Sequence, residues 1–185
     1  FCVATMENAR SALFYAKRPI QGLAGVRIGV PDEAATSLRL LQVLLSLKHK
    51  ARPEAYVTME DSHDAFLVTD DQALRRRMGA RGFPYRYDLG EEWFQWTGLP
   101  FVFSRWVARN DLDPKDALLL EDTLYVGLEE GVEALFHESR PRDRLLMLPK
   151  DIVEYIQGFR FFIGLSEQKA IDLFRSYLDQ LEVDA

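Results

Sequence analysis

The chain has 185 residues, of which 48% are hydrophobic and 28% are charged, which is enough apolar content for one core or two small lobes. This composition excludes an intrinsically disordered protein. The net charge of −6 disfavours a nucleic-acid-binding protein, and no apolar run approaches the length of a membrane-spanning helix. We therefore expect neither nucleic acid nor a membrane among its partners.

A single cysteine, Cys2, means that no internal disulfide can form, which is compatible with the reducing cytoplasm, where we expect the protein to act. The three histidines lack the spacing of metal ligands, so we expect no metal site. The chain begins at Phe1, without an initiating Met, inside what reads as a strand. We expect a natural N-terminal portion to precede this residue.

In the first half of the chain, short apolar runs bounded by glycine, proline and polar residues predict strands. These runs cover residues 11–15, 25–31, 56–59, 65–69 and 84–89. Apolar residues at helical spacing predict a helix over residues 36–48. A short basic helix is predicted over residues 72–78, and another helix begins over residues 91–96. Strands that alternate with helices indicate an α/β fold with a mostly parallel sheet, covered by helices on both faces.

From about residue 106 onward the pattern is helical. Asp113 and Pro114 are typical N-cap and first-turn residues of a long helix, which runs to about Glu138. Two more helices are predicted, one from Pro149 to Phe162 and one from a cap at Ser166 to Leu181. These helices are rich in aromatic residues and need a surface to pack against, which the expected N-terminal portion would supply.

The segment from Pro31 to Ser37 (PDEAATS) follows a predicted strand and opens a helix. The N–H groups and the macrodipole at a helix N-terminus favour an anion, and the hydroxyls of Thr36 and Ser37 could add donors. Alternatively, Asp32, Thr36 or Ser37 simply caps the helix, and the charges of Asp32 and Glu33 oppose an anion nearby. Spacing alone favours capping.

A second segment, Val68 to Leu74 (VTDDQAL), places two acidic residues at the end of a strand, where α/β folds bind their ligands. Asp71 is either a ligand-binding residue at this edge or the N-cap of the next helix, and the residues alone favour neither. The pair lacks a third carboxylate for a metal site.

The most informative stretch runs from Asp88 to Trp106 (DLGEEWFQWTGLPFVFSRW). Trp93 and Trp96 lie on one face of a predicted helix, after which the chain returns as a strand. These aromatic residues either pack in the core or border a pocket, and composition does not separate the two. No phosphate-binding loop, dinucleotide motif or catalytic triad is present. The residues alone indicate a two-lobed α/β binder of a small polar ligand.

The same stretch closely resembles the D-L-x-x-E-W-x-x-x-T-G-x-P-F-x-F-A-x-W signature of the chorismate dehydratases of menaquinone biosynthesis, in the futalosine pathway. Three weaker segments resemble the family in the same order. They are SALFYAKRPIQGL, beginning at Ser11, the segment from Ile28 to Leu44, and AFLVTDDQAL, beginning at Ala65. The resemblance thus extends over nearly the whole chain.

The resemblance implies a type II periplasmic-binding-protein-like fold, in which two lobes are joined by a hinge. The N-terminal strands of the first lobe, with an asparagine that the family uses in its active site, would be missing from this chain. We expect residues 1–10 to form the crossover from the first lobe, residues 11–105 the α/β lobe, and residues 106–185 the helical return to the first lobe.

The resemblance also implies a reaction, the dehydration of chorismate to 3-[(1-carboxyvinyl)oxy]benzoate, without a metal or an organic cofactor. A ring carbon loses a proton, the ring hydroxyl leaves, and the ring becomes aromatic. Ser11 matches the family's active-site serine. Thr36 and Ser37 match the helix N-terminus that receives a substrate carboxylate, and Asp71 matches an acidic residue of the substrate-binding site.

Phe101 and Phe103 match two phenylalanines of the signature, and we expect them to line the cleft. The chain departs from the family at three places: Asp70 stands where the family has glycine, Ser104 where it has alanine, and residues 31–33 are more acidic than a dianionic substrate favours. These departures motivate an alternative, a non-catalytic solute-binding protein of the same fold for a small carboxylate.

Overall fold

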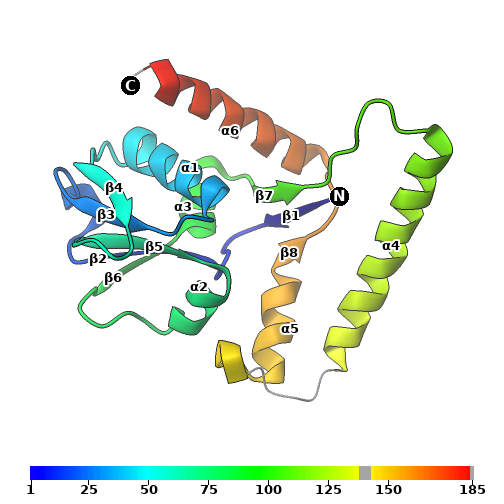
Figure 1. Cartoon of the computed structure of the whole chain (residues 1–185), viewed down its shortest axis with the longest axis horizontal. Coiled ribbons are helices and arrows are strands. Elements are labelled where there is room, and N and C mark those ends of the chain that lie inside the picture. Colours follow the sequence, from blue (N-terminus) through cyan, green and yellow to red (C-terminus); the bar gives the residue numbers. More distant parts are fainter. Residues whose placement is uncertain (138–142, 184–185) are drawn as a thin grey trace.

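The computed structural model describes residues 1–137 and 143–183, and it contains two β-sheets (Figure 1). The larger sheet has five strands in the order β4-β3-β5-β2-β6. These strands are β2 (Ala12–Ala16), β3 (Arg27–Val30), β4 (Ala55–Thr58), β5 (Ala65–Thr69) and β6 (Tyr85–Asp88). Each overlaps a run that the sequence predicts as a strand, so these five predictions are confirmed.

The larger sheet is mixed rather than mostly parallel, which corrects the prediction. β3 runs parallel to β4 and to β5, but β2 runs antiparallel to both of its neighbours, β5 and β6. Parallel neighbours are joined by crossover connections, usually helices. β2 is reached directly from β1 (Cys2–Thr5) and leads to β3 through a short 3-10 helix (Ile20–Gly22), so it is not part of a helical crossover unit.

Helices cover both faces of this sheet, as predicted. α1 (Ala35–Val43), which continues into a π-helical turn (Leu44–Lys48), and α3 (Leu89–Thr97) contribute to the core on one face, and α2 (Asp70–Arg76) to the core on the other. Phe14 of β2 packs with α1 and α3, whereas the next residue, Tyr15, packs with α2. All five residues of β2 are buried, as expected for a strand covered on both faces.

The smaller sheet is antiparallel, with strand order β7-β1-β8. β7 (Phe101–Arg105) and β8 (Phe159–Arg160) flank β1. β1 leads into the larger sheet through residues 6–11, and β7 returns from it after α3. Figure 1 shows these two strands side by side as the link between the larger sheet and the helical part of the chain.

The second half of the chain is helical, as predicted. α4 (Pro114–Phe136) begins as expected, because Oδ1 of Asp113 accepts a hydrogen bond from the Lys115 backbone N–H at 2.8 Å. The predicted end of this helix, Glu138, lies outside the described residues. The second described part of the chain begins with a 3-10 helix (Asp143–Leu145).

Two helix ends differ from the prediction. α5 (Pro149–Gln157) stops five residues before Phe162, because the chain then forms β8. β8 pairs with β1, with Phe159 opposite Thr5. α6 (Leu165–Val183) is not capped by Ser166, which lies in its first turn. The carboxylate of Glu167 instead accepts a hydrogen bond from the Gly164 N–H at 2.9 Å and so satisfies the start of this helix.

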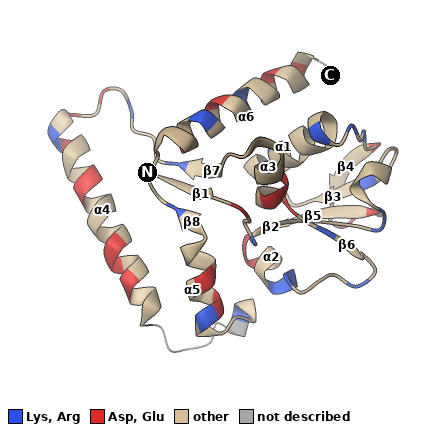
Figure 2. Cartoon of the chain, turned by 180° about the vertical axis from the view of Figure 1, so that it is seen from behind, with Lys and Arg blue, Asp and Glu red and all other residues tan. Residues whose placement is uncertain are grey.

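α4 has no buried residue, and Figure 1 shows it beside α5, away from the larger sheet. Acidic residues lie along α4 in Figure 2, while apolar side chains such as Leu119 and Val126 are also exposed. Within residues 1–137 and 143–183, no helix has the length and apolar character to cross a membrane.

Gly90 in the first turn of α3 has no room for a side chain. A Cβ atom there would lie 2.9 Å from the Ala9 backbone nitrogen and 2.9 Å from Oγ1 of Thr5. We predict that Gly90→Ala lowers the free energy of unfolding by about 1–3 kcal/mol, the usual cost of overpacking. Chemical denaturation measures this change.

A matched control is Gly127→Ala in α4, where a Cβ meets nothing within 4 Å. Because alanine is the better helix former, we expect this control to leave stability equal or raise it by up to about 1 kcal/mol. Equal effects of the two substitutions would contradict the close approach at Gly90.

Candidate active site

A cavity of about 400 Å³ lies where the N-terminus of α1, the ends of β2 and β5, the smaller sheet and α5 meet. Four of the six predicted site residues line it, namely Ser11, Thr36, Ser37 and Phe103. These residues come from three separate parts of the chain, so the fold brings together side chains that the sequence only suggests as a group. We call this cavity the cleft.

The N-terminus of α1 opens into the cleft without a side-chain cap. Its N-cap residue is Ala34, which makes no side-chain hydrogen bond, and Ala35, Thr36 and Ser37 line the cleft. The capping role that spacing favoured for this segment is therefore wrong. N–H groups at the start of a helix, together with the macrodipole, favour a carboxylate or another anion at this position.

Ser11 is held at the edge of the cleft by backbone contacts. Its Oγ donates a hydrogen bond to the Ala9 carbonyl oxygen at 3.1 Å, and its own carbonyl oxygen accepts one from the Asp70 N–H at 2.8 Å. Since the hydroxyl proton is used in this way, the oxygen lone pairs of Ser11 remain available as acceptors on the cleft side.

Tyr155 of α5 is a site residue that the sequence did not single out. It is half-buried, lines the cleft and makes a T-shaped contact with Phe159, with ring centroids 4.9 Å apart. Burial raises the pKa of the Tyr155 hydroxyl, the nearby Ser11 side chain lowers it, and the charges of Asp70 and Asp71 raise it further. The phenol is thus protonated at neutral pH and able to donate a hydrogen bond next to Ser11.

Of the two neighbouring aspartates, Asp70 rather than Asp71 lines the cleft. Asp71 is exposed in the first turn of α2, and the N-cap of this helix is Thr69, so the capping alternative for Asp71 is wrong. Asp70 has a φ of +52°, in the left-handed region that favours glycine. This geometry explains why a glycine suits the position.

Phe101 and Phe103 differ in their surroundings. Phe101 is 1% exposed and packs against Trp93 and Phe174, so it belongs mainly to the core. Phe103 borders both the cleft and a neighbouring cavity of about 330 Å³, which Phe101 also lines. Arg105 is among the residues of that second cavity.

The charge lining the cleft is acidic, from Glu33 and Asp70, and none of the described residues that line it is a lysine or an arginine. The positive potential for an anion would therefore come from the backbone at the start of α1. In the described residues, no group of three or more His, Cys, Asp or Glu side chains is arranged to hold a metal ion.

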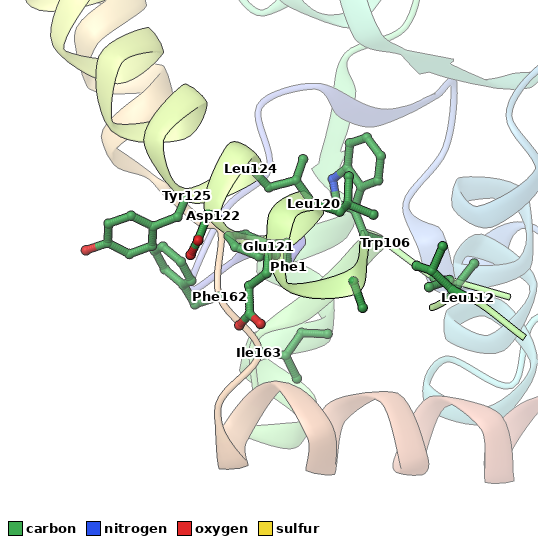
Figure 3. A pocket seen from close by; sticks show the side chains of 13 residues that line it. Phe1, Trp106, Leu112, Leu120, Glu121, Asp122, Leu124, Tyr125, Phe162 and Ile163 are labelled. Carbon is green, nitrogen blue, oxygen red and sulfur yellow. The ribbon is translucent and has the colours of Figure 1, made fainter. Parts of the chain in front are cut away.

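A larger cavity of about 620 Å³ lies between α4 and the start of β1, but its chemistry is different. Figure 3 shows that aromatic and aliphatic side chains form most of its wall, including Phe1, Trp106 and Phe162. None of the predicted site residues lines it. The smaller cleft, with its hydroxyls and free helix N-terminus, is the better candidate for an active site.

Comparison with known proteins gives an independent view of this chain. The sequence model of a family described as menaquinone biosynthesis matches residues 1–180. A chorismate dehydratase from Thermus thermophilus is 27% identical over an alignment 198 residues long, gaps included, which covers 96% of this chain and 71% of that protein.

Proposed function

The chain belongs to the menaquinone biosynthesis family, and we propose that it is a chorismate dehydratase. The relative from Thermus thermophilus supports this reaction. The observation that carries the proposal is the cleft, in which an uncapped helix N-terminus, suited to a carboxylate, lies together with Ser11 and Tyr155. The substrate would be chorismate, and the products 3-[(1-carboxyvinyl)oxy]benzoate and water.

In this proposal a carboxylate of chorismate binds the N-terminus of α1, where Thr36 and Ser37 add hydroxyl donors. The ring then lies against Phe103 and Phe159, with its reacting carbons near Ser11 and Tyr155. A ring carbon loses its proton and the neighbouring carbon loses its hydroxyl, so that one water is released and the ring becomes aromatic. Aromatisation drives the reaction, which consumes no oxidant or reductant.

We further propose that the fold is of the type II periplasmic-binding-protein kind, with residues 1–10 as the crossover, residues 11–105 as one lobe and residues 106–185 as the return to the other. The antiparallel pairing of β1 with β7 supports this assignment, because two adjacent connecting strands can act as a hinge. The free Cys2 fits an enzyme of the reducing cytoplasm.

Incubation of the protein with chorismate, followed by mass spectrometry, tests the activity. We expect the chorismate signal to be replaced by a species lighter by one water, with the ultraviolet absorbance of a benzoate. Binding is measured in parallel by thermal shift, since a ligand of the native state raises the apparent stability. A folded protein that binds chorismate but releases no product would remove the catalytic claim.

A non-catalytic solute-binding protein is the second candidate, because Glu33 and Asp70 place carboxylates in a cleft meant for an anion. A thermal-shift screen of small carboxylates separates the two candidates. Stabilisation by an unrelated solute, with none by chorismate, would favour the binding protein.

Asp70 should be unfavourable in two ways: its backbone is strained by a positive φ, and its carboxylate repels an anionic ligand in the cleft. We predict that Asp70→Gly raises stability by up to about 1 kcal/mol, because glycine adopts a positive φ without strain. Removing the carboxylate should also lower the Kd for chorismate about fivefold, which corresponds to about 1 kcal/mol for two unit charges a few ångströms apart in water. Chemical denaturation and calorimetry measure the two effects.

Asp70→Ala separates these effects, since it removes the charge but keeps a Cβ at the strained position. We expect tighter chorismate binding without the gain in stability. If neither variant binds chorismate more tightly, the Asp70 carboxylate does not face the ligand.

A further inference from the structure

The carboxylate of Asp88 is a buried junction between two segments. It is 9% exposed and accepts four backbone hydrogen bonds. Oδ1 accepts from the N–H groups of Ala9 at 2.8 Å, Gly90 at 2.9 Å and Glu91 at 3.2 Å. Oδ2 accepts from the Arg10 N–H at 2.6 Å. One side chain thus caps α3 and also ties the start of α3 to the loop between β1 and β2.

The two donors in that loop stand immediately before Ser11. Arg10 has a φ of +55°, a conformation that is costly for a residue with a Cβ and must be held by its surroundings. Consecutive N–H groups that converge on one anion form a backbone nest, and here the anion is the Asp88 carboxylate. Burial raises the pKa of this carboxyl, and the four N–H donors counteract that rise by stabilising the charged form.

The position of Ser11 depends on this nest. The Ser11 N–H donates to the Ala9 carbonyl oxygen at 2.6 Å, and Oγ donates to the same oxygen at 3.1 Å. We infer that Asp88 is a positioning residue for Ser11: its carboxylate fixes the turn at Ala9 and Arg10, and that turn sets the place of the Ser11 hydroxyl in the cleft. This inference rests on the proposed function of the cleft.

Asp88→Asn tests it selectively. The amide oxygen can keep the bonds made by Oδ1, and asparagine is a good N-cap, so α3 stays capped. The amide nitrogen then faces the Arg10 N–H, and two donors oppose each other where a hydrogen bond was made. We expect the kcat for chorismate dehydration to fall by about 10- to 100-fold, the effect of a small misplacement of a reacting group, with KM within about threefold.

The rescue variant is Arg10→Gly in the Asp88→Asn background. Glycine adopts a positive φ at no steric cost, so it should restore the turn without the carboxylate. We expect the kcat of the double variant to be at least about tenfold higher than that of Asp88→Asn. The salt bridge that Arg10 makes with Glu154 at 3.7 Å is exposed and contributes little. The control is Asp113→Asn at the exposed N-cap of α4, which should leave kcat unchanged.

Amide hydrogen exchange of the unsubstituted protein provides a readout that does not depend on activity. The amides of Ala9 and Arg10 should be strongly protected although they lie in a loop, and Asp88→Asn should accelerate the exchange of Arg10 most. Wild-type turnover in the Asp88→Asn variant, or an unprotected Arg10 amide in the unsubstituted protein, would overturn the inference. An absence of dehydration by the unsubstituted protein would instead refute the proposed function. The hydrogen-exchange measurement would then still test whether Asp88 fixes the turn before Ser11.

Discussion

Ser11→Ala should lower the turnover of chorismate by about 100-fold or more, the range observed for a group that transfers a proton or directs one. The expectation follows from the place of Ser11, whose Oγ lies in the cleft beside the Tyr155 hydroxyl. Stability should fall by no more than about 1.5 kcal/mol, because the substitution removes a single hydrogen bond to the Ala9 carbonyl oxygen. Steady-state kinetics and chemical denaturation measure the two quantities.

Ser176→Ala is the matched control for this substitution. Its Oγ also donates to a backbone carbonyl oxygen, that of Leu173 at 2.7 Å, but it lies on the exposed side of α6. The control should change stability by no more than about 0.5 kcal/mol, because the lost bond is exposed and alanine is the better helix former, and it should leave turnover unchanged. If Ser11→Ala retains the wild-type rate, Ser11 has no role in catalysis and the reaction must be assigned to other groups.

Local patterns predicted most of the fold. β5 and α4 begin at the predicted residues, because a short apolar run, a proline in the first turn and an aspartate at the N-cap act within a few residues. The end of α5 was predicted wrongly for the opposite reason. Phe159 and Arg160 leave the helix to pair with β1, more than 150 residues away in sequence. No local pattern encodes such a partner.

The candidate site, like the fold, could be predicted only in part. Ser11 and the pair Thr36 and Ser37 were identified by resemblance, and the fold brings them to one cleft. Tyr155 was missed because an aromatic residue on a helix usually packs in a core, and only the docking of α5 near Ser11 turns it toward the cleft. Asp71 was preferred to Asp70 because it matches an acidic residue of the family, whereas Asp70 stands where the family has glycine. In the structure Asp70 is the one that lines the cleft, and its positive φ is a property of the backbone that no side-chain pattern encodes.

Trp93→Ala should lower the free energy of unfolding by about 3–5 kcal/mol, the usual range for a buried tryptophan. The side chain is fully buried, and its ring makes edge contacts with Phe101, Phe174 and Tyr177. Its Nε1–H donates to the Pro100 carbonyl oxygen at 3.1 Å. Trp93 thus joins α3 to the start of β7 and to α6, and its loss removes packing from three elements at once.

Trp106→Ala at the other end of the same signature is the natural comparison, because that side chain is 62% exposed. We expect it to change stability by no more than about 0.5 kcal/mol. A Trp93→Phe variant divides the effect further, since it keeps an aromatic ring but leaves the Pro100 oxygen without its donor. If Trp93→Ala changed the free energy of unfolding as little as Trp106→Ala, the aromatic residues of the signature would serve ligand binding rather than packing. The contacts of Trp93 and the backbone bonds of Asp88 predict instead that this signature acts on the site indirectly, by fixing the strands and the loop that carry Ser11.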